Sequence, residues 1–190
     1  MLFRSLSRPA ALVFPILLIN GQKKITLILA GAALLIFSLT DIVRLSHSKI
    51  NLFFFTKKTG IYKEKEQRKF SSMTLFLLAS FLIMLIFSMP IAVTAMVFLI
   101  FGDMFSKFFG IQYGRIKLFG KSLEGSIAYF IACFVAGFFL LAFLPSLSLE
   151  IIICGAVAAT LAEMLPLGVD DNLSAGIISA AAMFLAQKVF

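Results

Sequence analysis

Long runs of apolar residues, separated by short polar stretches, make up most of this chain. A helix needs about 20 apolar residues to cross a bilayer. Runs near that length occur at 6–20, 25–43, 72–88, 90–102, 123–144, 149–166 and 173–189. The pattern predicts an all-α fold, a polytopic transmembrane helical bundle of about seven spans. No change of composition interrupts the series, so we expect residues 1–190 to form a single integral-membrane domain.

Two of the runs are short. The run at 6–20 follows two arginines like a signal peptide, but no small-x-small cleavage site comes after it, so we interpret it as a span. The run at 90–102 begins at Pro90, which indicates a tight turn between antiparallel helices. We expect residues 103–122, which follow it, to form a loop.

The charges predict an orientation. Only 14% of the residues are charged, and the formal net charge is +8. If 44–71 is cytoplasmic, every Lys and Arg except Lys23, Lys24 and Lys188 falls on the cytoplasmic side, as the positive-inside rule requires. We therefore expect a cytoplasmic N-terminus. This rule explains the cationic surplus without a nucleic-acid partner, and we expect none.

The acidic residues indicate where chemistry occurs. One His and no CxxC motif leave no case for zinc, iron or haem. Asp41 and Arg44, three apart at a helix end, are predicted to pair. Ionisable groups at membrane helix ends are costly unless they pair or bind something. Six acids lie at such ends, on one predicted face of the membrane: Asp41, Asp103, Glu124, Glu163, Asp170 and Asp171.

The segment 102–126, GDMFSKFFGIQYGRIKLFGKSLEGS, has the parts of a nucleotide phosphate site. Its glycines, Gly102, Gly114 and Gly125 among them, allow close backbone approach. Its cations can neutralise a polyphosphate; they are Lys107, Arg115, Lys117 and Lys121. The next helix begins at 122–126, where free N–H groups suit an anion. Asp103 and Glu124 could hold Mg²⁺. The alternative is a cationic loop with turn glycines, in which Ser122 caps the helix.

A second segment, 162–172, reads AEMLPLGVDDN. Glu163 lies inside an apolar run, and Asp170, Asp171 and Asn172 precede the last one. One of these three could simply cap that helix. A cap needs a single residue and leaves Glu163 unexplained, so the cluster also suits a divalent metal or a general base.

These residues resemble the CTP-dependent lipid-alcohol kinases, a family that includes dolichol kinase, phytol kinase and the CTP-using diacylglycerol kinase. The match lies in Gly102-Asp103, Gly114-Arg115 and KSLEGS at 121–126, and it resumes at Ala162-Glu163 and 170–172. Ser106 stands where members commonly carry alanine. Because the chain is short beside eukaryotic dolichol kinases, the resemblance implies a prokaryotic membrane enzyme.

The resemblance implies transfer of the γ-phosphate of CTP to a polyprenol, dolichol, phytol-like alcohol or diacylglycerol at the cytoplasmic face. Residues 102–172 would hold the nucleotide motifs, with Mg²⁺ bound by Asp103, Glu124 and Asp171. Asp170 or Glu163 would accept the proton of the lipid hydroxyl. The phosphates and nucleotide would contact Gly102, Lys107, Gly114, Arg115, Lys117, Lys121, Ser122, Glu124, Gly125, Ser126 and Asn172.

Two other functions remain open at this point. A CTP-dependent phospholipid cytidylyltransferase would use the same nucleotide and metal but would release pyrophosphate. A small ion-coupled transporter would also contain intramembrane acids, although carriers usually bind near the midplane rather than at one face. The sequence does not select among the lipids and does not give the oligomeric state.

Overall fold

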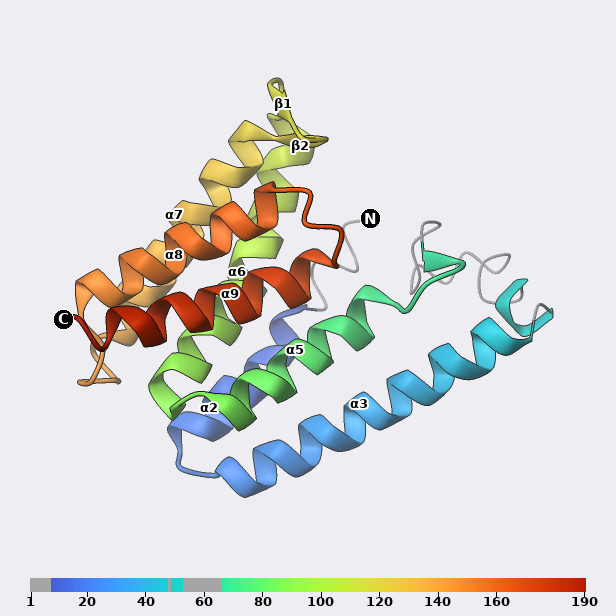
Figure 1. The fold of residues 1–190 in the computed structure, drawn as a ribbon, viewed down its shortest axis with the longest axis horizontal. Coiled ribbons are helices and arrows are strands. Elements are labelled where there is room, and N and C mark those ends of the chain that lie inside the picture. Colours follow the sequence, from blue (N-terminus) through green and yellow to red (C-terminus); the bar gives the residue numbers. More distant parts are fainter. Residues whose placement is uncertain (1–7, 48, 53–65) are drawn as a thin grey trace.

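The chain folds into a bundle of apolar helices (Figure 1). The computed structural model describes residues 8–47, 49–52 and 66–190. The elements are a 3₁₀-helix η1 (Arg8–Leu12) and the α-helices and strands that follow it. These are α2 (Val13–Ile19), α3 (Lys23–Ser46), α5 (Ser72–Ile86), α6 (Met89–Gln112), β1 (Lys117–Leu118), β2 (Lys121–Ser122), α7 (Leu123–Leu140), α8 (Leu149–Met164) and α9 (Asp171–Ala186).

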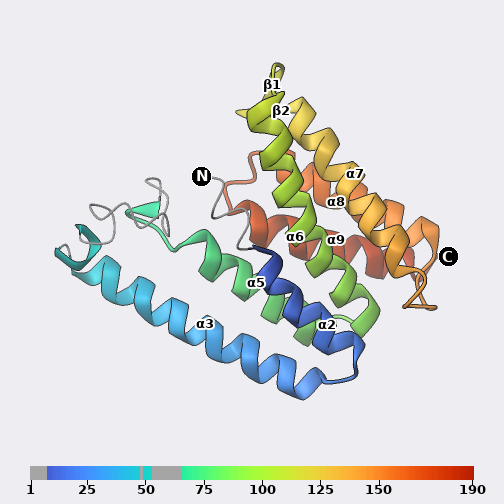
Figure 2. The same cartoon turned by 180° about the vertical axis from the view of Figure 1, so that it is seen from behind.

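Within the described residues, three helices are long and apolar enough to cross a membrane: α3, α6 and α7. Their burial differs sharply. In α6, 61% of the apolar window is buried, against 17% in α3. Helix α6 contacts α2, α5, α7, α8 and α9, whereas α3 packs against α2 and α5 at one side (Figure 2). The core therefore surrounds α6, and the outer face of α3 leaves many apolar side chains exposed.

The predicted end of the fourth apolar run is wrong. We expected a loop from residue 103, but α6 continues to Gln112. Asp103 and Lys107, one helical turn apart, form an ion pair along the helix surface, so two charges that looked like the start of a loop neutralise each other. Pro90 lies in the first turn of α6, as the turn prediction required.

A two-residue turn closes the β-hairpin that links α6 to α7. Lys117 pairs with Ser122 and Leu118 with Lys121. Phe119 and Gly120 both have positive φ, 51° and 84°, which is the conformation of the turns that fit the twist of a hairpin. The hairpin carries Lys121 from the end of α6 to the beginning of α7.

Six helix ends meet on one side of the bundle. Contacts described below join the C-terminal ends of α3, α6 and α8 to the N-terminal ends of α5, α7 and α9. Sequence neighbours therefore run antiparallel (Figure 1). Lys23, Lys24 and Lys188 lie at the opposite ends of their helices.

A buried ion pair fastens α3 to α5. Arg44 Nη2 lies 3.0 Å from Asp41 Oδ1, and both side chains are fully buried, so the predicted pair is confirmed. Arg44 also donates to the carbonyl oxygens of Glu66 and Lys69. Asp41 Oδ2 accepts from Ser71 N at 2.7 Å. We call these residues the Arg44 cluster; it fixes the start of α5 against the end of α3.

Candidate functional site

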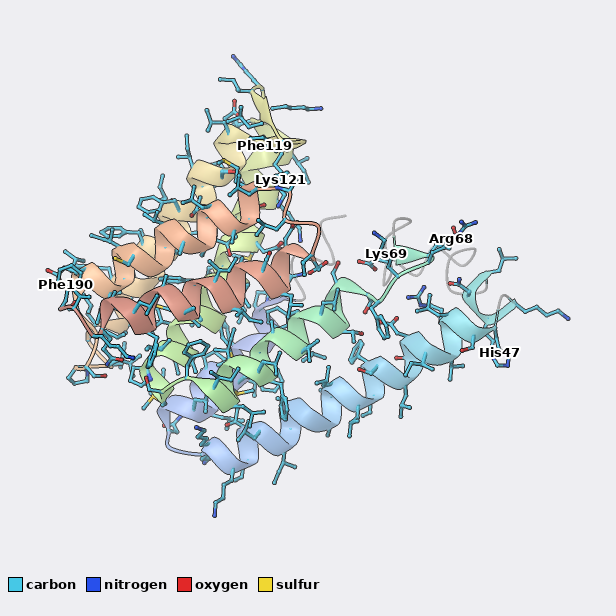
Figure 3. All side chains as sticks on the ribbon, viewed as in Figure 1. His47, Arg68, Lys69, Phe119, Lys121 and Phe190 are labelled. Carbon is cyan, nitrogen blue, oxygen red and sulfur yellow. The ribbon has the colours of Figure 1, made fainter. Side chains whose placement is uncertain are left out.

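Lys121 lies at the centre of a second charged cluster. Its Nζ is 3.0 Å from Glu163 Oε1 and 2.9 Å from Asp171 Oδ2, and it also donates to the carbonyl oxygen of Glu163. The hairpin holds Lys121 beside the end of α8 (Figure 3). Glu163 comes from the last turn of α8 and Asp171 from the first turn of α9. We call these three residues, with Asn172, the Lys121 cluster; the sequence predicted all four for the site.

Helix α6 contributes the next contacts. Ser106 Oγ lies 3.5 Å from Glu163 Oε1. Asp103, about one helical turn before Ser106 on α6, pairs with Lys107. The negative charges of Asp103 and Asp171 both act through space on the carboxyl group of Glu163. Three carboxyl groups, those of Asp103, Glu163 and Asp171, thus lie near the two ammonium groups of Lys107 and Lys121.

Two buried oxygens in the Lys121 cluster have no hydrogen-bond partner in the described part of the chain. They are Glu163 Oε2 and Asn172 Oδ1, and only 4% of Asn172 is exposed. Buried polar atoms nearly always find a partner, so an unpaired one calls for a water, an ion or a ligand. These acceptors suit a cation or a hydrogen-bond donor.

Asp170 has a structural role at the beginning of α9. Its Oδ1 accepts from Asn172 N at 3.0 Å and from Asn172 Nδ2 at 2.8 Å, which caps the helix. Asn172 Nδ2 also reaches the carbonyl oxygen of Ser72 at 3.4 Å, tying α9 to the start of α5. The capping alternative that the sequence left open therefore applies to Asp170, while Asp171 faces Lys121.

The KSLEGS segment shapes the junction of the hairpin and α7. Ser122 Oγ caps α7 by accepting from Gly125 N at 3.2 Å. Glu124 Oε1 accepts from Arg115 N at 3.0 Å and from Ile116 N at 3.2 Å, so it holds the hairpin to the helix. Ser126 is buried and contacts the Ser122 carbonyl oxygen. Arg115 and Lys117 are exposed on the hairpin.

The glycines predicted for phosphate binding lie where α6 and α7 approach closely. A Cβ on Gly125 would lie 2.9 Å from the Ser106 carbonyl oxygen and 3.3 Å from Gly110 Cα. Gly102 packs on the ring of Tyr129, and Gly114 packs against Ser122. Close packing of α6 on α7 is thus a sufficient reason for Gly102 and Gly125, and packing of the segment after α6 on Ser122 is a sufficient reason for Gly114.

The predicted magnesium ligands do not come together as one set. Among the described residues, no group of three or more His, Cys, Asp or Glu side chains could hold a metal ion. Glu124 is the outlier, because it binds the hairpin and lines an apolar groove. Mg²⁺ needs only one or two protein carboxylates when phosphate oxygens and water complete its shell. The other two predicted ligands each form an ion pair with a lysine, Asp103 with Lys107 and Asp171 with Lys121.

Sequence reasoning missed the contact of Ser106 with Glu163. It also missed the hydrogen bonds that join Ser72, at the beginning of α5, to Asn172 and Glu66. Glu66, 3% exposed, accepts from Ser72 Oγ at 2.7 Å. A helix predicted through residue 112 would have placed Asp103, Ser106 and Lys107 on one face, since residues three and four apart are neighbours. The lysine-flanked segment 53–55, whose three phenylalanines predict an interfacial segment rather than a span, lies outside the described residues.

Comparisons with known proteins leave the family open. No family model matches this chain, and no solved structure matches it. It is 26% identical over 183 residues to an uncharacterized protein of Rickettsia prowazekii, RP860, covering 90% of this chain and 87% of the relative.

Proposed function

We propose that this chain is a membrane-embedded kinase that transfers the γ-phosphate of CTP to the hydroxyl of a lipid alcohol. The observation that carries the proposal is the Lys121 cluster. A lysine held between two carboxylates stands at one end of an apolar bundle, beside buried oxygens that have no partner in the described part of the chain. Phosphoryl transfer asks mainly for charge neutralisation and positioning, and these are the groups that supply both.

The chain would cross the membrane seven times with a cytoplasmic N-terminus. The alternating helix directions support this topology, with η1 and α2 together forming the first span and α5 and α9 crossing as shorter apolar helices. The 16-residue helix α8 would cross between α7 and α9. The end of the bundle that holds Lys107, Arg115 and Lys117 would be cytoplasmic, as the positive-inside rule favours. The Rickettsia relative supports a prokaryotic cell membrane.

Lys121 would bind the transferred phosphate, and Arg115 and Lys117 on the exposed hairpin would bind the rest of the polyphosphate. Asp103 and Asp171 would hold Mg²⁺, which would neutralise phosphate charge when bound. Glu163 would position Lys121 through its 3.0 Å contact. Asp170 would position Asp171 and Asn172 by capping α9. The preference for CTP rests on the family resemblance of residues 102–172.

The cytidylyltransferase is the second candidate, because the same cluster could bind CTP there. It would require a lipid phosphate to attack the α-phosphorus. A carrier is supported less, since every described acid except Glu150 lies toward the end of the bundle that holds Lys121, and Glu150 lies at the opposite end rather than at mid-length.

Product analysis tests the proposal. Purified protein in lipid nanodiscs would receive CTP, Mg²⁺ and a panel of isoprenoid alcohols and diacylglycerol. We expect CDP and a phosphorylated lipid alcohol in equal amounts. Pyrophosphate with a cytidylylated phospholipid would establish the transferase instead. No nucleotide turnover by folded protein, with every lipid tested, would contradict both enzymes.

A further inference from the structure

The hairpin between α6 and α7 carries apolar side chains that the bundle leaves uncovered. Phe119, at its tip, is 64% exposed, and its neighbours on and beside β1 are exposed too, Ile116 at 55% and Leu118 at 38%. The exposed cations Arg115 and Lys117 alternate with them along the chain. Contiguous apolar patches rimmed by polar residues mark sites of interaction with proteins or membranes.

Phe119 also has an uncommon backbone conformation. Its φ is 51°, and among the described residues it alone, apart from glycines, has a positive φ. Hairpin turns of this kind favour Asn, Asp or Gly at their central positions, and a bulky residue there is an outlier. Such strain persists where the surroundings or a function maintain it. Packing within the described residues does not offset it, because most of the Phe119 side chain is exposed.

The hairpin lies at the edge of the bundle, next to an apolar helix surface. Figures 1 and 2 show it on the side opposite α3, projecting past the end of α8. Phe108 and Ile111, near the end of α6, and Tyr113 at its C-cap are exposed. The apolar surface of a membrane-length helix therefore continues toward the hairpin. Aromatic side chains are enriched at the level where the lipid headgroups begin.

We propose that the hairpin tip is an interfacial anchor, inserted into the headgroup region of the membrane leaflet at this end of α6 and α7. The lipid gives the ring of Phe119 the apolar surroundings that the described protein does not. Arg115 and Lys117 stay at the membrane surface, because long cationic side chains reach back to water. They remain available there for the polyphosphate.

The size of the patch favours lipid over a protein partner. A stable protein interface uses about 20–30 residues on each side. The hairpin offers three exposed apolar residues, Ile116, Leu118 and Phe119. Single aromatic side chains flanked by Lys and Arg are, by contrast, typical of the boundary between membrane and water. The composition of the hairpin, with Arg115 and Lys117 beside Phe119, matches that boundary.

The anchor fixes the depth of the Lys121 cluster. Lys121 follows Phe119 by two residues, so their Cα atoms lie within about 7 Å. The headgroup region on each side of a bilayer is about 5–8 Å thick. Insertion of Phe119 at the base of this region therefore holds Lys121 within the headgroup layer. This step rests on the proposed kinase function, because it keeps the site at the depth where the hydroxyl of a membrane lipid lies.

A tryptophan at the hairpin tip tests the anchor independently of turnover. The chain contains no tryptophan, so Phe119→Trp reports on that position alone. The variant is placed in phosphatidylcholine nanodiscs whose acyl chains are brominated either near the headgroup or near the chain end. We expect blue-shifted emission that loses about half or more of its intensity with the shallow bromines and is little quenched by aqueous iodide. Emission as in water, quenched by iodide and unaffected by bromines, would overturn the proposal.

Two further single-tryptophan variants calibrate the measurement. Arg68→Trp, exposed at the same end of the bundle (Figure 3), should emit as in water and be quenched by iodide. Leu35→Trp, at mid-length of α3 and 65% exposed, should be quenched most by the deep bromines. If the tryptophan at 119 is shielded from iodide and from both bromines, a protein contact takes the place of lipid and the proposal is wrong. Ile116→Trp should show the same shallow quenching and decides the matter if Phe119→Trp does not fold.

Phe119→Gly tests what the anchor does for the site. Glycine suits a positive φ, so the hairpin and the thermal stability should be retained without the ring. We expect the apparent KM for lipid alcohol in nanodiscs to rise about 10-fold, with kcat within about 2-fold of the wild type, and Phe119→Trp to restore the KM. An unchanged KM would contradict the positioning role. An anchored tryptophan in a protein without CTP-dependent phosphorylation would support the anchor and contradict the kinase, so the two failures can be distinguished.

Discussion

The molecule contains two charged clusters at the same end of the bundle, and they differ in how fully their buried polar atoms are hydrogen-bonded. In the Arg44 cluster, the guanidinium donates to Asp41 and Asn51 side chains and to two carbonyl oxygens, with no exposure to solvent. In the Lys121 cluster, the lysine side chain is 26% exposed and two nearby buried oxygens have no partner in the described chain. The Arg44 cluster pairs its cation with one carboxylate, that of Asp41, whereas the Lys121 cluster pairs its cation with two, those of Glu163 and Asp171.

This difference separates a structural role from a binding role. A buried ion pair is tolerated when hydrogen bonds satisfy its remaining donors and acceptors, as at Arg44. Its loss should damage the fold. A cluster with unpaired oxygens and an accessible cation is not complete by itself. Its loss should damage ligand binding and leave the fold intact.

Arg44→Met should have the largest effect. It leaves the buried Asp41 carboxylate without its cation, which typically costs about 3–5 kcal/mol of stability. We expect early thermal aggregation in detergent, measured by size-exclusion chromatography after heating. Wild-type thermal stability in this variant would contradict a structural role for the Arg44 cluster.

Lys121→Met should do the opposite. We expect the wild-type thermal stability but a loss of lipid phosphorylation of about 10²–10³-fold, because one preorganised group that neutralises transition-state charge is removed. Lys188→Met, at the far end of α9 where the lysine lies over the Phe184 ring, is the matched control. Reduced stability with retained specific activity would place Lys121 among the structural residues.

Asp170 and Asp171 are neighbours in sequence, but we expect Asp170 to have the structural role and Asp171 the ligand-binding role. Asp171→Asn should lower turnover about 10-fold or more with little change in stability, because Asp171 contacts Lys121. Asp170→Asn keeps a capping oxygen and should change turnover and stability little. Asp170→Ala removes the cap and should lower the free energy of unfolding by about 1 kcal/mol. Equal losses of turnover in Asp170→Asn and Asp171→Asn would show that the division is wrong.

His47→Ala should have the smallest effect. His47 follows α3 directly, and its side chain is exposed near the Arg44 cluster. We expect stability and turnover within experimental error of the wild type. A clear loss of turnover would reveal a role that neither cluster explains.

The sequence predicted the helices well because apolar runs of membrane length leave few alternatives. It also predicted Lys121, Glu163 and Asp171, since ionisable residues at such helix ends need partners. It missed the continuation of α6 because Asp103 and Lys107 neutralise each other only if the helix is already formed. It could not predict the packing roles of Gly102 and Gly125, which depend on what lies opposite them.

The apolar groove that Glu124 lines could not be predicted either. Its walls consist of Phe, Ile and Ala, which also cover surfaces that simply face lipid. Only the three-dimensional placement of Glu124 distinguishes it, because one carboxylate oxygen binds the hairpin and the other is buried with no donor among residues 8–47, 49–52 and 66–190.

The most direct test of the central claim is transfer of labelled γ-phosphate from CTP to a long isoprenoid alcohol, measured for the wild type and Lys121→Met in the same nanodiscs with Mg²⁺. The account predicts labelled lipid from the wild type, faster with CTP than with ATP, and background from the variant. Absence of labelled lipid from folded wild-type protein, or equal rates from the two proteins, would contradict it.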